Sequence, residues 1–213
     1  TPRYDARHMW VDVHADNAFD ENCWVIAADG GEEAVVVDPG FEPARVRDLL
    51  ERAGRRPVAV LATHGHHDHV GAAAEFCGDD LPFVIHEADA LALRDARAWG
   101  AGYEAAPQAV TDLRTVVDGD VLRFAGFEIH VVHTPGHTPG SVLYRTDGWV
   151  LSGDVVFAGA IGRSDFPNSS PEAMERSLDR FLAMPDALEV FPGHGPRTTV
   201  GRERATNPYL RGR

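Results

Sequence analysis

Histidine is concentrated at one place in this chain, and that place most constrains how the chain can fold. Four of the eleven histidines lie in the run THGHHDH at 63–69, which continues directly from the apolar stretch PVAVLAT at 57–63. That stretch predicts a buried strand. Sites in open α/β sheets form at the carboxyl ends of strands, so the run lies where such a site is expected. Neighbouring imidazoles add little to packing, so metal binding explains the run better than a solvated loop does.

The spacing within the run separates its polar residues into two pairs. On an extended loop, residues i and i+2 project to the same side, so His64 and His66 can bind one cation. Asp68 and His69 begin the following turn and can bind a second cation. The run alone therefore predicts a metal site.

Three more turns at predicted strand ends carry a polar residue of the same kind. His137 lies at the tip of HTPGHTPGS (133–141), Asp154 follows Ser152-Gly153, and His194 lies in Pro-Gly-His-Gly at 192–195. A single histidine or aspartate in a glycine turn is more often structural, because its side chain bonds nearby backbone groups. Taken together with the run at 63–69, the three residues become candidate ligands.

Charge and composition exclude several classes of function. The chain has 213 residues, with 33 acidic against 20 basic residues and a net charge of −13. This balance repels phosphate backbones and argues against a nucleic-acid partner. All of the basic residues are arginine, so no lysine amine is available for covalent catalysis.

Cysteine content and hydropathy address the cellular location. Cys23 and Cys77 are the only cysteines and form no CxxC pair, which predicts free thiols in a reducing compartment. No apolar run approaches the ~20 residues of a membrane-spanning helix, and the first residues, TPRYDARHMW, lack the apolar stretch of a signal peptide. We therefore expect a cytoplasmic protein without a membrane partner.

Hydrophobic periodicity predicts two sheets with helices outside them. The expected strands are 9–13, 22–28, 34–37, 57–63, 82–86, a meander over 116–151, and 188–191. The expected helices are 42–53, 69–77, 87–96 and 171–183, the last beginning at a proline after two serines. No Ser/Gly-rich linker interrupts the pattern, so we expect an α+β fold in a single domain, 1–213.

The order of these motifs resembles that of the metallo-β-lactamase-fold hydrolases. The matching residues are His64-x-His66-x-Asp68-His69, His137, Asp154 and His194, with Asp38 at the end of an early strand. The resemblance implies an αββα sandwich of two mixed β-sheets with helices on the outer faces. It also implies two divalent metal ions, zinc with iron or manganese as alternatives. His67 and His133 are left as non-ligands.

The same resemblance assigns each candidate ligand to a metal ion. It implies that one ion is held by His64, His66 and His137, the other by Asp68, His69 and His194, and both by Asp154. Asp38 is then expected to hold a ligand imidazole or its loop, with a simple turn cap as the equal alternative.

Within this superfamily, two stretches resemble the short bacterial members of the glyoxalase II group. They are SGDVVFAGAIGRSDFP (152–167) and PGHGPRTTVGRERATNPYL (192–210). That group hydrolyses thioesters of glutathione with hydroxyacids, so the resemblance implies a metal-dependent thioesterase acting on a small thioester. We hypothesise that a metal-bridging hydroxide attacks the thioester and that Asp68 orients this hydroxide while binding metal. Only about 18 residues follow Gly195, and Arg163 and Asp165 stand where longer members have a lysine and a tyrosine. A different low-molecular-weight thiol therefore remains open.

Two other activities and one non-enzymatic function remain as alternatives. Gly162-Arg163-Ser164-Asp165-Phe166 also resembles the persulfide dioxygenases, which hold one iron, and the HTPGHTPG turn resembles that of small-lactone hydrolases. A zinc-stabilised binding module would instead have a closed metal site.

Two residues outside the ligand motifs are candidates for substrate contact. Arg163 can bind a substrate carboxylate, with a salt bridge to Asp165 as the equal alternative. Tyr103, in the Gly-rich stretch 97–107, is a candidate in a flap over the site, with an ordinary loop as the simpler reading.

Overall fold

The computed structural model describes residues 9–15, 19–76, 81–93 and 110–213. Within these ranges the first sheet has six strands in chain order. They are β1 (Met9–His14), β2 (Cys23–Ala28), β3 (Glu33–Val37), β4 (Arg56–Leu61), β5 (Phe83–His86) and β6 (Leu113–Val116). β1 to β3 pair antiparallel and β3 to β6 parallel, so the sheet is mixed.

The helices of this half follow strands of the first sheet. α1 (Pro43–Arg52) connects β3 to β4, α2 (His67–Val70) and α3 (Ala73–Phe76) follow β4, and the 3-10 helix η1 (Ala90–Leu93) follows β5. Val46, Leu49 and Leu50 lie at helical spacing on α1 and are buried against the sheet.

The second sheet is built from the later part of the chain. In the described residues its six strands are, from one edge to the other, β14 (Thr198–Thr199), β13 (Glu189–Pro192), β10 (Trp149–Gly153), β9 (Val142–Arg145), β8 (Phe127–His133) and β7 (Val121–Phe124). β10 and β13 are parallel and the remaining neighbours antiparallel. A ribbon of β11 (Val156–Phe157) and β12 (Ala160–Ile161) leads to α4 (Pro171–Leu182), and α5 (Val200–Thr206) follows β14.

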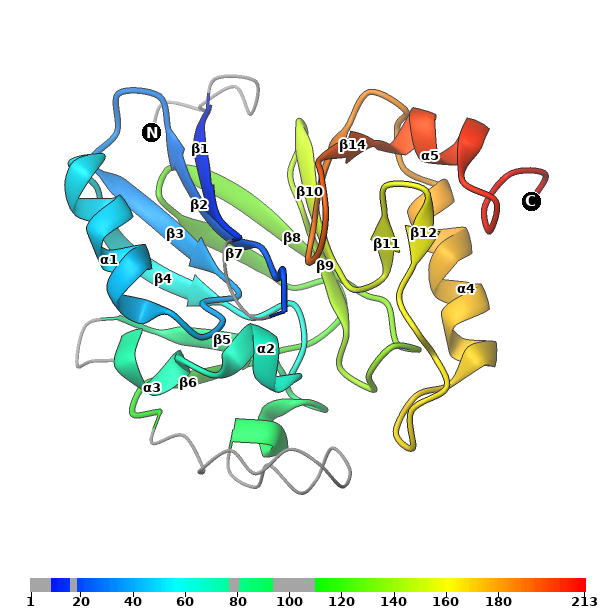
Figure 1. Ribbon diagram of the computed structural model, residues 1–213, viewed down its shortest axis with the longest axis horizontal. Coiled ribbons are helices and arrows are strands. Elements are labelled where there is room, and N and C mark those ends of the chain that lie inside the picture. The colour runs from blue at the N-terminus through cyan, green and yellow to red at the C-terminus, as the bar shows by residue number, and fades with distance from the viewer. Residues whose placement is uncertain (1–8, 16–18, 77–80, 94–109) are drawn as a thin grey trace.

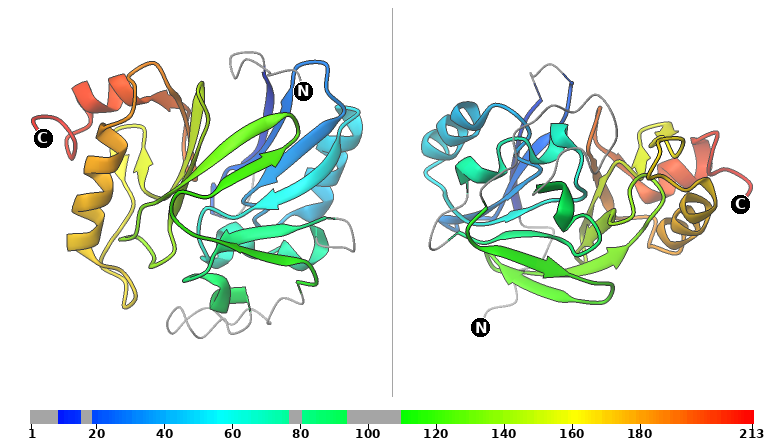
Figure 2. Two further views of the ribbon diagram at one scale, coloured as in Figure 1. Left: turned by 180° about the vertical axis from the view of Figure 1, so that it is seen from behind. Right: turned by 90° about the horizontal axis from the view of Figure 1, so that it is seen from below.

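The layers form the αββα sandwich expected from the sequence. Figures 1 and 2 show α1 outside the first sheet and α4 outside the second, with the sheets facing each other between them. The core between the sheets includes Trp24, Leu61, Tyr144, Trp149 and Phe191. β8 shows how the sequence produces this arrangement, because its buried and exposed residues alternate along FEIHVVH.

The start of α4 matches the sequence prediction in detail. Ser170 is the N-cap, its hydroxyl accepts the backbone N–H of Ala173, and Pro171 occupies the first turn. Such a cap contributes about 1 kcal/mol. Met174, Leu178 and Phe181 are the buried face of this helix.

Two predicted helices differ in the structure. The helix expected over 69–77 is divided into α2 and α3, because the Ala72 N–H donates to the Gly40 carbonyl at 2.6 Å instead of to a carbonyl of the preceding turn; residue 77 lies outside the described residues. The helix expected over 87–96 begins as a turn and continues as η1, because the side chain of Asp89 bonds two other loops; residues 94–96 lie outside the described residues.

The meander expected over 116–151 is confirmed as β7 to β10 except at its first residues, because Val116 ends β6 of the first sheet, and the C-terminal prediction was incomplete. Leu113–Val116 pairs in parallel with β5 in the first sheet, and the chain crosses to the second sheet at the turn 117–120, so the meander is β7 to β10. β14 and α5 follow β13 and were not expected. No helix in the described part of the chain has the length and apolar character to span a membrane.

Candidate metal centre

The loop after β4 carries four of the candidate ligands into the interior. His64 and His69 are buried, His66 is the residue before α2, and Asp68 lies in its first turn. The short helix places Asp68 and His69 one turn beyond His66, so the loop and the helix present separate pairs of ligands. His67 packs edge-on against Phe41 and belongs to neither pair.

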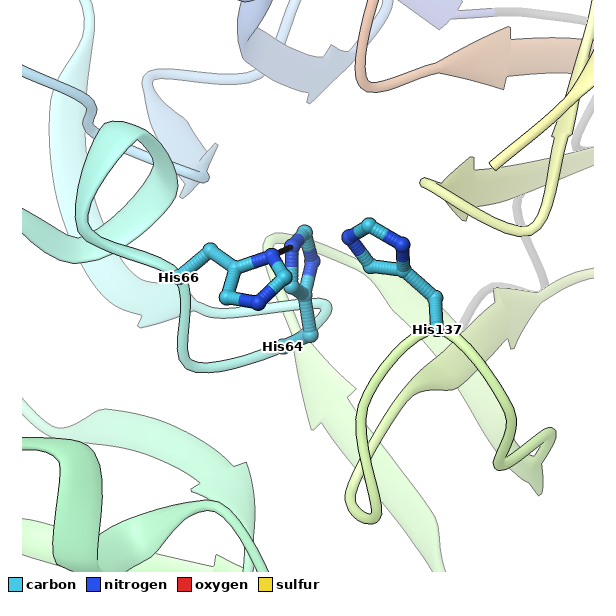
Figure 3. Close-up of side chains that lie close together, drawn as sticks. All are labelled: His64, His66 and His137. Carbon is cyan, nitrogen blue, oxygen red and sulfur yellow. Dashed lines mark hydrogen bonds between the residues drawn. The ribbon is translucent and has the colours of Figure 1, made fainter. Parts of the chain in front are cut away.

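Three imidazoles form the first cluster, which we define as His64, His66 and His137 (Figure 3). The first two follow β4 of the first sheet, and the third follows β8 of the second sheet. One ring nitrogen from each lies within 4.8 Å of the others. Burial and the neighbouring imidazoles lower the pKa of His64 well below its ordinary value, and burial lowers the pKa of His66 to about 3 and also lowers that of His137. Buried, neutral imidazoles offer their lone pairs to a metal ion.

Three side chains form the second cluster, which we define as Asp68, His69 and His194, within the same distance limit. His194 Nε2 lies 3.5 Å from Asp68 Oδ2, and His69 Nε2 lies 3.7 Å from the same oxygen. His194 is at the end of β13, so this cluster also joins the two sheets.

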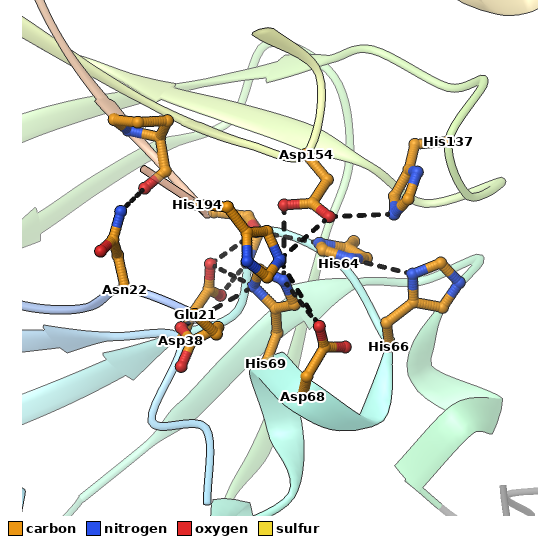
Figure 4. Close-up of polar contacts among 12 residues, drawn as sticks. Glu21, Asn22, Asp38, His64, His66, Asp68, His69, His137, Asp154 and His194 are labelled. Atoms are coloured by element: carbon orange, nitrogen blue, oxygen red, sulfur yellow. Dashed lines mark hydrogen bonds and ion pairs between the residues drawn. The ribbon is translucent and has the colours of Figure 1, made fainter. Parts of the chain in front are cut away.

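Asp154 lies between the two clusters (Figure 4). Its Oδ1 is 3.4 Å from His69 Nε2, and its Oδ2 is 3.4 Å from His137 Nε2 and 3.5 Å from His194 Nε2. One carboxylate therefore faces ligands of both clusters, which is the position of a bridging ligand.

Negative charge dominates the second cluster. Burial alone would lower the pKa of His69, but the carboxylates of Asp154 and Asp68 raise it well above its ordinary value. The pKa of His194 is raised to about 10 for the same reason: hydrogen bonds to the two carboxylates outweigh its burial. The carboxylates therefore favour positive charge at the second cluster, which a bound metal ion would supply.

The residues present fit the metal ions that the fold implies. His69 Nε2, His137 Nε2 and Asp154 Oδ1 are buried without a hydrogen-bond partner among the described residues, although buried polar atoms are normally paired. Imidazole nitrogens and carboxylate oxygens suit zinc, iron or manganese. The first cluster, the second cluster and Asp154 together provide seven ligands for two ions.

Asp38 contacts both a candidate ligand and the loop that carries the others. Its Oδ2 accepts hydrogen bonds from His69 Nδ1 at 3.0 Å and from the Thr63 hydroxyl at 2.7 Å, and its Oδ1 accepts the backbone N–H of Thr63 at 2.7 Å. A carboxylate on Nδ1 directs the lone pair of Nε2 toward the metal position. Asp38 lies in the left-handed region with a φ of 50°, which aspartate tolerates better than most residues.

The sequence reasoning did not identify Glu21, which lies behind the second cluster. Its side chain is fully buried, and its Oε1 is 4.0 Å from His69 Nδ1. Burial raises its pKa well above the ordinary value. A Cβ on Gly40 would collide with the Glu21 carboxyl group, so glycine is required opposite it. A single glutamate before an apolar strand gives no signal in the sequence.

Asn22, which was also not identified, holds the loop that carries His194. Its side-chain amide, drawn in Figure 4, donates to the carbonyl of Pro192 at 3.0 Å. It also donates to the carbonyl of Gly195 at 2.8 Å. Trp24 Nε1 donates to the same Pro192 carbonyl at 2.9 Å. The segment between β1 and β2 thus fixes the ligand at the end of β13.

The candidates for substrate contact differ in what the structure describes. Arg163 makes a two-point ion pair with Asp165 and lies 4.4 Å above the ring of Phe166, which is the salt-bridge alternative of the sequence analysis. Its backbone carbonyl accepts a hydrogen bond from His137 Nδ1 at 2.7 Å. Tyr103 and Cys77 lie outside the described residues, whereas Cys23 is a buried free thiol. His133 stacks on His86 and is away from both clusters.

With this geometry described, comparison with known proteins identifies the family. The model of the metallo-beta-lactamase superfamily matches residues 16–194, and the chain belongs to that superfamily. Among curated relatives, hydroxyacylglutathione hydrolase GloC of Haemophilus influenzae is 32% identical, covering 95% of this chain and 98% of that protein. Probable metallo-hydrolase YqgX of Bacillus subtilis is 34% identical, covering 90% and 92%.

Solved structures of the same fold include a metallo-beta-lactamase and a protein in a di-iron-bound form. The B3 metallo-beta-lactamase BLEG-1 matches with a TM-score of 0.87 and 31% identity, covering 95% of this chain and all of that one. TTHA1623 in a di-iron-bound form has a TM-score of 0.79 and 38% identity over 93% and 100%. ETHE1 from Myxococcus xanthus has a TM-score of 0.76 and 25% identity over 96% and 85%. The chain is therefore similar to metallohydrolases and to ETHE1.

Proposed function

We propose that this protein is a binuclear metal-dependent hydrolase that cleaves a thioester of a small hydroxyacid and a low-molecular-weight thiol. The observation that carries the proposal is the position of Asp154, whose two oxygens face His69 of one cluster and His137 of the other. A structural metal site would be closed by one compact set of ligands, whereas a shared carboxylate between two sets suits a catalytic pair of ions.

The chemistry that such ions supply is known in general. Bound divalent ions lower the pKa of water and polarise a substrate carbonyl. In this chain the first cluster, the second cluster and Asp154 would hold them. Zinc is our first choice of metal, with iron or manganese as alternatives.

Asp68 is the residue that we expect to orient the attacking water. Its side chain is 16% exposed, whereas the side chain of His69 is fully buried, so Asp68 borders the space that a substrate can enter. The imidazoles of His69 and His194 hold its pKa below the usual range despite burial, so it is a hydrogen-bond acceptor at neutral pH. A thiolate leaves without a strong general acid, so no further proton donor is required.

Aromatic rings limit the access of solvent to both clusters. Phe166 lies 5.5 Å from the His66 ring and 5.9 Å from the His137 ring, and Phe157 lies 5.8 Å from the His194 ring, all measured between centroids. These apolar edges suit the acyl or thiol chain of a small substrate. Arg163 stands beside Phe166 and would bind a substrate carboxylate after exchanging Asp165 for it.

The similarity to GloC supports a glutathione-type thioester, and the substrate-binding roles of Arg163 and Tyr103 remain predictions. A cytoplasmic location, with neither nucleic acid nor membrane as a partner, completes the proposal.

A second candidate function is persulfide oxidation with a single iron. It is favoured by the similarity to ETHE1. It is also favoured by the 26% exposure of the His194 side chain, because the more exposed histidine of the second cluster is the ligand that a one-metal site would most readily lack. A small-lactone hydrolase is the third candidate, because the sequence of the turn 133–141 resembles that of small-lactone hydrolases.

The experiment that separates these functions measures metal content per chain, S-lactoylglutathione hydrolysis and oxygen uptake with glutathione persulfide on one preparation. Two metal ions with thioester hydrolysis is the expected result. One iron with oxygen consumption would overturn the proposal and remove His194 from the ligand set. A lactone and a β-lactam are tested as further substrates. Turnover of either that is faster than turnover of S-lactoylglutathione would also overturn the proposal.

A further inference from the structure

Asp89 is a buried carboxylate that belongs to neither metal cluster and lies between loops of the two sheets. It follows β5, and its side chain is completely buried. Its Oδ2 accepts the backbone N–H of Gly65 at 2.8 Å and the hydroxyl of Thr138 at 2.6 Å, and its Oδ1 accepts the backbone N–H of Gly140 at 2.6 Å. One side chain therefore bonds three donors in two separate loops.

The two loops that Asp89 joins carry all three ligands of the first cluster. Gly65 is the residue between His64 and His66, and Thr138 is the residue after His137. This carboxylate thus links the loop of the first two imidazoles directly to the loop of the third. Hydrogen bonds to an ionised buried acceptor are the stronger kind and resist displacement by water.

The packing around Asp89 leaves little freedom for another arrangement. A Cβ on Gly140 would lie 2.5 Å from the Asp89 carboxyl group, so the loop approaches the carboxylate as closely as glycine allows. The Thr138 hydroxyl also lies 2.7 Å from Ser141 Oγ, which orients it toward Asp89.

The second cluster is held by different residues. His69 is bonded by Asp38, and the loop of His194 is bonded by Asn22. Neither of these contacts involves Asp89. A change at Asp89 should therefore act on one metal position and spare the other.

We propose that Asp89 is a positioning residue that sets the spacing of the first cluster and thereby its affinity for a metal ion, independently of the second cluster. This inference rests on the metal binding in the proposed function, and it does not depend on which substrate is cleaved.

The test compares Asp89→Asn in two backgrounds that each keep one cluster. His194→Ala disrupts the second cluster and keeps the first, and His66→Ala does the reverse. In asparagine an NH₂ group replaces one of the two carboxylate oxygens. Depending on which oxygen is replaced, this NH₂ group faces either the Gly140 N–H or the donors of Gly65 and Thr138. Zinc affinity is measured by competition with a chromophoric chelator, and Co²⁺ spectra report the coordination geometry.

We expect Asp89→Asn to weaken zinc binding about 10- to 100-fold in the His194→Ala background, with an altered Co²⁺ spectrum. In the His66→Ala background the affinity should stay the same. Equal losses in both backgrounds, or no loss in either, would overturn the inference.

A matched control and a milder variant separate positioning from general stability. Glu203 is another fully buried carboxylate, with donors from Gly159, Thr198 and Asn207, so Glu203→Gln should lower the melting temperature and leave zinc affinity unchanged. Thr138→Val removes one donor to Asp89 and should give a smaller loss, in the His194→Ala background only.

If Asp89→Asn does not fold, Thr138→Val in the two backgrounds decides the question, and an unchanged affinity overturns the inference. The two proposals fail separately. A wild-type protein that binds metal but does not hydrolyse the thioester contradicts the proposed function alone.

Discussion

Replacing Asp38 by asparagine tests how the second cluster is kept ready for a metal ion. The carboxylate accepts a hydrogen bond from His69 Nδ1, which leaves Nε2, the nitrogen that faces Asp154 and Asp68, as the one that can bind a metal ion after losing its proton. Asparagine has nearly the same shape and also tolerates the left-handed backbone at this position. Asp38→Asn therefore changes the hydrogen bonding with little change in packing.

The size of the effect follows from the three donors on Asp38. The amide oxygen can stay on the backbone N–H of Thr63, which places an N–H donor against the Thr63 hydroxyl and His69 Nδ1. The hydroxyl can rotate to accept, but Nδ1 can accept only if the His69 proton moves to Nε2, where it blocks metal binding. A hydrogen bond to a charged group contributes about 1.5–3 kcal/mol, which corresponds to roughly 10- to 100-fold weaker metal binding.

The assay is zinc titration of the metal-free protein, with the far-ultraviolet spectrum recorded to show that the variant is folded. Asp20→Asn is the control, because it removes the same charge at another left-handed residue whose side chain is exposed. A folded Asp38→Asn protein that binds two zinc ions as tightly as wild type would refute the tautomer argument and leave Asp38 as a turn cap.

Four further outcomes are expected. Asp154→Ala should lose both metal ions and activity, measured by metal content and thioester hydrolysis. Gly193→Ala would press its Cβ on the Asp154 carboxylate and on the His69 ring, and should lower kcat/KM ~100-fold, with the fold retained by circular dichroism. Burial and His133 lower the pKa of His86 to about 4, so its contribution to stability is complete above pH 6.5 and is lost as the pH falls toward 4; His86→Gln should flatten that slope in denaturant titrations of the metal-loaded protein. Chelation should lower the melting temperature by roughly 5–10 °C per ion relative to free zinc at 100 times its dissociation constant.

The elements that the sequence predicts well are those whose periodicity agrees with their burial. β8 alternates between core and solvent, and α4 combines a serine cap, a proline and an apolar stripe, so local pattern and tertiary environment agree. Leu113–Val116 was not predicted as a strand, because a four-residue strand whose burial does not alternate gives little periodicity. η1 replaced a predicted helix because Asp89 bonds distant loops, and local propensity does not include such contacts.

The candidate ligands were predictable because metal binding requires particular residue types at strand ends, and these are visible along the chain. The structure brings all seven together, from the loop after β4 and from the ends of three elements in the second sheet. Glu21, Asn22 and Asp89 were not predictable, because each acts through backbone groups or ring nitrogens far away in the sequence. Their residue types are common in turns, so only the fold distinguishes them from caps.

The distribution of the ligands over the two sheets connects metal binding to the packing of the sandwich. Asp68 and His69 lie on α2, which follows β4 of the first sheet. His137 and Asp154 follow β8 and β10 of the second sheet, and Asp154 faces ligands of both clusters. The core between the sheets is apolar, so its contacts are less directional than hydrogen bonds. Metal–ligand distances tolerate shifts of only about 0.2 Å. The polar contacts from Asn22 to the loop of His194 and from Asp89 to the loop of His137 therefore add directional constraints that help to align the clusters around Asp154.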